Sequence, residues 1–235
     1  MKQAFHGSRD VVTVTGPDAT PYLQGQVSQD VAALGVGESA WSFILQPQGK
    51  VDAWFRVTRF DDEGYFLDVD TGYGEVLLAR LKRFLLRTKA ELSLETWDWR
   101  ARLGELPEVL VSGVGGVRVA SIIPGVVDLV APDFFAHAPF GEKPDEELIS
   151  ESAFQLLRIR AGVPAMGSEL DENTIPAEAR IVNQSVSFTK GCYTGQELVA
   201  RVDSRGDNTP RKLRIVTGSG LPEPGVVLTL SLIHI

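Results

Sequence analysis

Strand-like and helix-like patterns alternate along this chain without a regular period. Apolar residues alternate with more polar ones over residues 51–57, which predicts a half-buried strand. Residues 65–69 are expected to pair with that strand across a turn at 61–64. Apolar residues then recur at helical spacing over 77–85. Because these elements follow no steady strand–helix–strand repeat, the sequence favours an α+β fold over a doubly wound parallel sheet.

The second half of the chain repeats this mixture. Valine and isoleucine are frequent over residues 105–131, including 109–111 and 126–130, which predicts a second group of strands. Ser150 is expected to cap a helix over 151–160, which then ends at a glycine and a proline. A further strand is predicted over 212–217.

We expect two α+β lobes, over residues 1–104 and 105–211, that are able to exchange segments. Residues 212–235 would begin a third unit. Its last part, 225–235, is so apolar that a continuing fold should bury it. This pattern indicates that the chain is cut short or that its last residues are not native sequence.

Composition excludes several classes of function. A net charge of −8 argues against a general nucleic-acid binder, since such proteins need clustered Lys and Arg. The single cysteine, Cys192, rules out an internal disulfide and a cluster held by this chain alone. The three histidines lie far apart, so no metal site is expected. Neither a signal peptide nor a membrane-length apolar stretch is seen, which predicts a cytoplasmic protein.

The densest chemistry lies around Cys192. Gly191 and Gly195 flank the thiol, and this predicts a sharp, exposed turn. Lys190 lies two residues before the thiol, where a cation would favour a thiolate. A helix beginning near Leu198 would add to that field. We therefore expect a reactive or partner-facing thiol, with a small buried residue in a tight turn as the alternative.

The segment around this cysteine belongs to a longer pattern. Residues 190–197, K-G-C-Y-T-G-Q-E, resemble the signature of YgfZ-type folate-binding proteins, which are relatives of the glycine-cleavage T-protein. Four other segments resemble the same family in the same order: L-Q-G-Q-V-S-Q-D-V at 23–31, Q-P-Q-G-K-V at 46–51, R-I-R-A-G-V-P at 158–164 and T-I-P-A-E at 174–178. The resemblance covers about residues 10–225.

This resemblance implies a T-protein-like, multi-lobed α+β fold around a central opening that takes up tetrahydrofolate or a folate derivative. Residues 212–235 would then hold only the start of a truncated C-terminal β-barrel. The implied role is folate-dependent support of iron–sulfur cluster assembly or repair, with iron–sulfur client proteins as partners. The composition adds the expectation of no direct contact with nucleic acid or membrane. Cys192 and Lys190 are the residues marked for that role.

Three residues are candidates for the pterin ring of a folate. Glu178 matches the family's Pro-x-Glu element, and a carboxylate suits the pterin N–H groups; a glutamate opening a helix is the alternative. Gln24 and Gln26 lie near the implied opening, where their amides would contact a pterin or satisfy buried backbone groups.

Three cations are candidates for the folate tail, which ends in glutamate. Lys50 follows a glycine, and it would meet the tail or simply end a hairpin turn. Arg201 and Arg205 would bind carboxylates, since guanidinium groups do so in a bidentate manner, or else belong to a solvated charged loop.

Two other functions remain open at this point, and with them the question of whether the chain is an enzyme. A folate-dependent aminomethyl or C1 transferase needs a carboxylate near the reacting folate nitrogen, and Asp70 lies in roughly that region. A thiol redox or interaction module without folate is the other possibility.

Overall fold

The computed structural model describes residues 2–104, 117–132, 146–206, 208–217, 220 and 226. Its strands are β1 (Lys2–Thr15), β2 (Ser39–Leu45), β3 (Val51–Asp61), β4 (Gly64–Asp70), β5 (Glu91–Leu103), β6 (Val117–Val119), β7 (Val126–Ala131) and β8 (Glu146–Leu148). Its helices are α1 (Ala19–Gln26), α2 (Gly74–Lys82), α3 (Glu151–Arg160), α4 (Val182–Ser185) and α5 (Gln196–Ser204), with 3₁₀ turns η1 (Val31–Ala33) and η3 (Pro176–Ala179). The expected α+β fold is confirmed.

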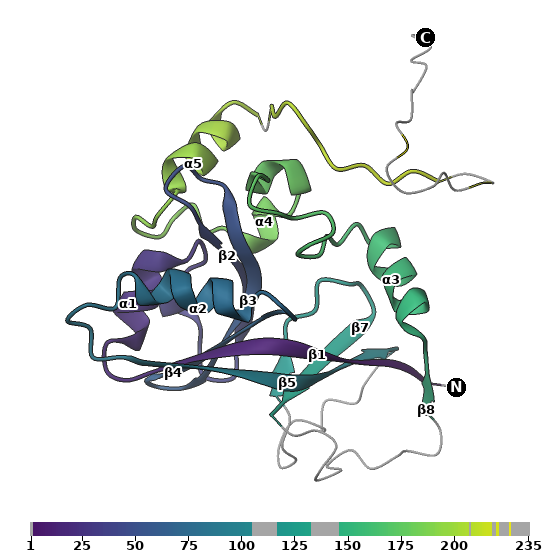
Figure 1. The fold of residues 1–235 in the computed structure, drawn as a ribbon, viewed down its shortest axis with the longest axis horizontal. Coiled ribbons are helices and arrows are strands. Elements are labelled where there is room, and N and C mark those ends of the chain that lie inside the picture. Colours follow the sequence, from purple (N-terminus) through teal and green to yellow (C-terminus); the bar gives the residue numbers. More distant parts are fainter. Residues whose placement is uncertain are drawn as a thin grey trace.

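Within the described residues, all the strands belong to one sheet. Its order is β2-β3-β4-β1-β5-β7-β6, with antiparallel neighbours, and β8 adds to β1 in parallel. The long β1 pairs with β4 at one end and with β5 along nearly its whole length (Figure 1). Strands from both sides of residue 104 therefore share this sheet. The division into two lobes stays a prediction.

The prediction that residues 51–57 form a half-buried strand is wrong in one respect. β3 does form, but Trp54, Arg56 and Thr58 on its second face are also buried. Arg56 is accommodated there because its guanidinium contacts Asp68 (2.6 Å) and Asp128 (2.7 Å), and a buried charge needs such partners. Arg9 binds Asp68 as well, at 3.0 Å. We call Arg9, Arg56, Asp68 and Asp128 the charge network.

Helix ends follow the sequence signals unevenly. Ser150 accepts the Ala153 N–H at 3.2 Å, which confirms the predicted cap of α3. The helix predicted over 77–85 is too long at its C-terminal end: α2 ends at Lys82, and Phe84 is 48% exposed.

The helices α3, α4 and α5 lie above the sheet in Figure 1, and the extended segment 208–217 runs over α4. The strand predicted over 212–217 is wrong: the segment pairs with no described strand, and a strand requires a partner ladder. Its Leu213 N–H donates instead to the Glu178 carbonyl at 2.9 Å. The predictions for residues 109–111 and 225–235 lie outside the described residues, apart from Val226. Among the described residues, no helix is long and apolar enough to span a membrane.

Candidate functional site

Cys192 lies in the turn between α4 and α5, and its side chain is exposed. Lys190 and Tyr193 on either side of it are buried. The helix expected after the turn begins at Gln196 and leaves Gly195 at its N-cap. The predicted exposed turn is therefore present in the structure, with a free thiol between two buried anchors.

Lys190 fastens this turn to the end of α1. Its ammonium donates to the carbonyl oxygens of Gln24 and Val27, both at 2.6 Å, and of Gln29 at 3.1 Å. An ammonium has three donors, so all of them are used here. Carbonyls at a helix C-terminus carry partial negative charge, which suits a cation. The structure thus gives Lys190 a clamping role, while its predicted effect on the Cys192 thiol stays a prediction.

Burial perturbs both anchors. Burial lowers the pKa of Lys190 to about 8, and the nearby Asp30 carboxylate opposes that effect. Burial raises the pKa of Tyr193 to about 12. The ammonium lies over the Tyr193 ring, 5.1 Å from its centroid, so the two anchors also contact each other.

Two glycines bring the Gln46–Lys50 motif against the Cys192 turn. A Cβ added to Gly195 would lie 2.6 Å from the Gln46 carbonyl oxygen and 3.2 Å from the Gly49 Cα. Gly195 also has φ +82°, a conformation that side chains other than glycine rarely adopt. Only glycine therefore fits this contact without a shift.

The predicted pterin residues are mostly engaged in holding the fold. Gln24 donates to Asp30 at 2.9 Å, and its amide oxygen accepts the backbone N–H of Val31 (3.0 Å) and Ala32 (3.2 Å). The amide oxygen of Gln26 is buried and has no hydrogen-bond partner in the described structure.

Glu178 is buried on η3, and its carboxylate accepts from Arg211 at 3.1 and 3.2 Å and from the Ile175 N–H at 3.2 Å. Arg211 also donates to the Asn173 carbonyl at 3.5 Å, and Lys50 donates to the Asn173 side chain at 3.3 Å. Glu178 and Lys50 thus belong to one cluster. That cluster ties segment 208–217 to the loop before η3.

The predicted tail residues Arg201 and Arg205 are exposed on α5 and at its C-cap. Arg201 lies 3.7 Å from Glu197, one turn earlier. Because both side chains are exposed, both guanidinium groups are accessible. The exposed pair of Arg201 with Glu197 contributes little to stability.

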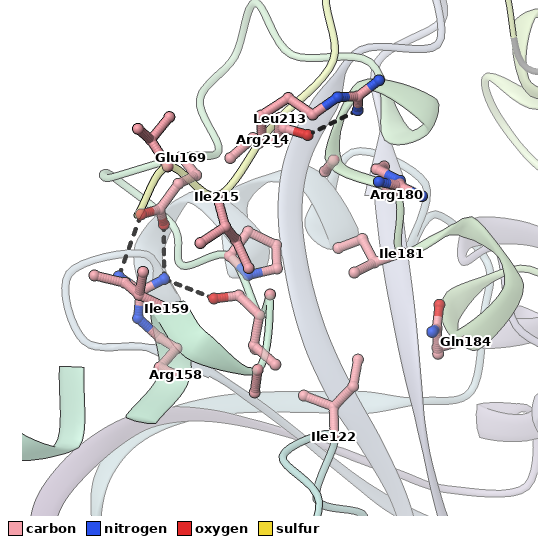
Figure 2. A pocket seen from close by; sticks show the side chains of 16 residues that line it. Ile122, Arg158, Ile159, Glu169, Arg180, Ile181, Gln184, Leu213, Arg214 and Ile215 are labelled. Atoms are coloured by element: carbon pink, nitrogen blue, oxygen red, sulfur yellow. Dashed lines mark hydrogen bonds and ion pairs between the residues drawn. The ribbon is translucent and has the colours of Figure 1, made fainter. Parts of the chain in front are cut away.

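A larger hollow lies elsewhere, between α3, η3 and the segment 213–216 (Figure 2). We call it the central pocket. Its volume is about 600 Å³, within the range typical of small-molecule sites. Its wall combines apolar side chains with charged ones and with the Gln184 amide; the apolar residues labelled in Figure 2 are Ile122, Ile159, Ile181, Leu213 and Ile215. None of the predicted site residues is among those that line it.

Arg158 and Glu169 form the polar end of the central pocket. Arg158 donates to Glu169 at 2.8 Å and to the Val163 carbonyl at 2.7 Å (Figure 2). Burial by itself would raise the pKa of Glu169, but hydrogen bonds from Arg158 and the Ala165 N–H outweigh it and lower the pKa. The Glu169 carboxylate is therefore ionised and already paired.

A narrower hollow of about 80 Å³ adjoins the central pocket, with which it shares Ile122 and Arg158. Trp41 lines it, and the buried Trp41 indole N–H has no hydrogen-bond partner in the described structure. Asp70 lines it too, but Asp70 pairs with Arg9 and accepts the Met166 N–H at 2.9 Å.

Sequence reasoning missed the central pocket because its wall is assembled from segments between Ile122 and Val216. The one visible signal was the motif at 158–164, which supplies Arg158, Val163 and Pro164 to the wall. In the described part of the chain, no group of His, Cys, Asp and Glu is arranged to hold a metal ion.

No family model matches the chain. Among solved structures, it is similar in fold to the glycine cleavage system aminomethyltransferase T from Bartonella henselae. That match has a TM-score of 0.73 and 18% identity, and it covers 87% of this chain and 63% of the other. At this identity the likeness shows the fold alone, which confirms the expected T-protein-like architecture.

Two relatives among known proteins carry informative names. An iron–sulfur cluster assembly factor IBA57 homologue, mitochondrial, from Neurospora crassa is 29% identical over 85% of this chain, which spans 50% of that protein's length. The tRNA-modifying protein YgfZ of Escherichia coli O157:H7 is 30% identical over 94% of this chain and 74% of its own length. With this identity and coverage, the chain belongs to the YgfZ family.

Proposed function

We propose that this chain binds tetrahydrofolate and supports iron–sulfur cluster assembly or repair in client proteins through Cys192. The observation that carries the proposal is the exposed thiol on a turn that the buried Lys190 and Tyr193 anchor to the fold. A buried structural cysteine would be packed into the fold, whereas this one is presented to solvent. One thiolate cannot hold a cluster alone, so Cys192 would supply a single ligand to a cluster shared with the client.

The names of the relatives agree with this role in different ways. The Neurospora relative is named as an iron–sulfur cluster assembly factor, and the Escherichia coli relative as a tRNA-modifying protein. We favour the first role because an accessible single thiol is suited to ligand exchange with a metal cluster.

The central pocket is our proposed folate site. Its size and the apolar part of its wall suit the two aromatic rings of a folate. The Gln184 amide offers both a donor and an acceptor for a pterin edge, and the unpartnered Trp41 N–H lies in the adjoining narrower hollow. Glu178 would act on this site from behind the wall, since it holds Arg211 and Leu213 in place.

Aminomethyl transfer is less well supported. A transferase would use a carboxylate that is free to approach the folate nitrogen, but both carboxylate oxygens of Asp70 are engaged, one by Arg9 and one by the Met166 N–H. The paired Glu169 offers no free carboxylate either.

Calorimetric titration of tetrahydrofolate under anaerobic conditions tests the folate site. We expect micromolar binding to the wild type and a loss of about tenfold, or 1.4 kcal/mol, for Gln184→Ala and for Glu178→Ala. Asp62→Ala, at an exposed side chain of the hairpin turn, is the control and should bind as the wild type does. No binding by folded wild type would refute the folate site.

A complementation assay tests the role of Cys192 separately. In cells that lack their own copy of the gene, we expect Cys192→Ser to bind folate normally but fail to restore the activity of an iron–sulfur enzyme. Full restoration by Cys192→Ser would rule out the thiol role, and turnover of an aminomethyl donor by the variant would favour the transferase instead.

A further inference from the structure

A second pocket of about 300 Å³ adjoins the central pocket. We call it the basic pocket. It is lined by Ala177, Arg180, Val182, Asn183, Lys212 and Arg214. Arg180 and Arg214 also line the central pocket, where Figure 2 shows them along its upper and right-hand sides. A ligand that extends from the central pocket into the basic pocket therefore passes these two guanidinium groups.

The three cations of the basic pocket have no carboxylate partner within the described residues. Arg214 donates only to the neighbouring Leu213 carbonyl, at 3.0 Å. The other arginine of the central pocket, Arg158, is by contrast paired with Glu169. In a chain with a net charge of −8, three uncompensated cations around one hollow produce a local field that attracts anions.

The backbone at Arg180 is itself unusual. Arg180 has φ 62° and ψ 27°, in the left-handed region that residues other than glycine seldom occupy. In the described structure, only one other residue besides glycine has a positive φ, the exposed Arg87 at 64°. Asparagine tolerates this conformation well. Arg87 therefore offers a control that is matched to Arg180 in residue type and in backbone conformation.

We propose that the basic pocket binds the carboxylates of a poly-γ-glutamyl folate tail, an inference that rests on the proposed folate site. Each added γ-linked glutamate brings one carboxylate, and arginine binds carboxylates in a bidentate manner. The aromatic rings occupy the central pocket, and the tail extends past Arg180 and Arg214 toward Lys212. The chain thereby selects long-tailed folates over the monoglutamate.

The experiment compares two ligands on three proteins by anaerobic calorimetry. Tetrahydrofolate monoglutamate and triglutamate are titrated into the wild type, the double variant Arg180→Asn/Arg214→Gln, and Arg87→Asn. We expect the wild type to bind the triglutamate about tenfold more tightly than the monoglutamate, a difference of 1.4 kcal/mol. The double variant should lose this preference, whereas Arg87→Asn should keep it. Raising NaCl from about 50 to 300 mM should reduce the preference in the wild type, because salt screens the contacts.

The outcomes separate this inference from the proposed function. If the wild type binds both ligands equally, the tail site is refuted while the folate site stands. If the wild type does not bind even the monoglutamate, both are refuted. Equal loss of preference in Arg87→Asn and in the double variant would show that the preference does not depend on the basic pocket. A further titration of the wild type with oligo-γ-glutamate and with tripolyphosphate tests the chemistry of the pocket, and tighter binding of tripolyphosphate would refute the tail site and assign the pocket to phosphate.

Discussion

The charge network and the Cys192 turn use polar groups in opposite ways. In the network, the side chains of Arg56 and Asp68 are 1% and 0% exposed. They form an ion pair with each other and further ion pairs with Asp128 and Arg9 on other strands. At the turn, the Lys190 ammonium donates to backbone carbonyls, while the Cys192 thiol is free. The comparison shows that the residues next to Cys192 contribute to the stability of the fold, whereas the Cys192 side chain itself does not.

The largest effect is expected when the network is broken. Asp68→Ala would leave the Arg9 and Arg56 guanidinium groups buried without this carboxylate, so we expect a loss of about 3–5 kcal/mol in the free energy of unfolding. Urea denaturation followed by circular dichroism measures it. Asp62→Ala, whose side chain is 88% exposed beside Arg59, should cost less than about 1 kcal/mol. A similar loss in both variants would contradict the importance of burial.

Next comes the glycine contact that supports the turn. Gly195→Ala combines left-handed strain with overlap against Gln46, and we expect it to cost about 3 kcal/mol in unfolding free energy. Gly37→Ala shares the left-handed backbone, at φ +86°, but meets nothing within 4 Å, so about 1 kcal/mol is expected. Equal costs for these two variants would show that the contact between the motifs is unimportant.

Removing the Lys190 clamp should lower the free energy of unfolding by a smaller amount, and that amount should depend on pH. Lys190→Met leaves buried carbonyls unpaired, and we expect a loss of about 1–3 kcal/mol at pH 7. Because the folded pKa of about 8 lies below the ordinary value of 10.5, the unfolded chain binds more protons between these pH values. The wild type should therefore gain stability over the variant as the pH rises from about 8 toward 10.5.

Urea unfolding of both proteins at several pH values checks this trend. Lys82→Met, on the exposed side of α2, serves as the control for general alkaline effects and should show no such gain. A difference between wild type and Lys190→Met that stays flat or shrinks above pH 8 would mean that burial does not dominate at this lysine.

The smallest effect on stability belongs to Cys192. Because its side chain is exposed, Cys192→Ser should change the free energy of unfolding by less than about 0.5 kcal/mol. The same variant is expected to lose the support of iron–sulfur clients. A loss of stability above about 2 kcal/mol in urea denaturation would mean that the thiol is structural after all, and that the two regions do not differ as described.

Local patterns in the sequence led to correct predictions wherever one short segment decides the structure. The cap at Ser150, the strands around residues 51–69 and the exposed turn at Cys192 each depend on a few neighbouring residues. Predictions from local helix and strand propensity were too long or wrong where tertiary contacts decide the structure. α2 stops before Phe84, and the extended segment 212–217 finds no described strand to pair with.

The predicted site residues show the same limit. The family motifs marked Gln24 and Lys190 separately, and the structure shows that the Lys190 ammonium donates to the Gln24 carbonyl. The motifs gave no indication that the Lys190 ammonium would bind carbonyls, or that Glu178 would hold Arg211. Those partners lie tens to more than a hundred residues away along the chain, and periodicity or capping rules carry no information over that range.

The sequence by itself determined the α+β class, the family and the position of the free thiol, because each is encoded in contiguous residues. Only the tertiary structure decided where hollows of ligand size lie. The central and basic pockets combine Ile122, Arg180 and Arg214, whose separation along the chain hides their proximity. A pocket exists only after the chain has closed around it, and so its shape and charge are properties of packing and not of any single segment.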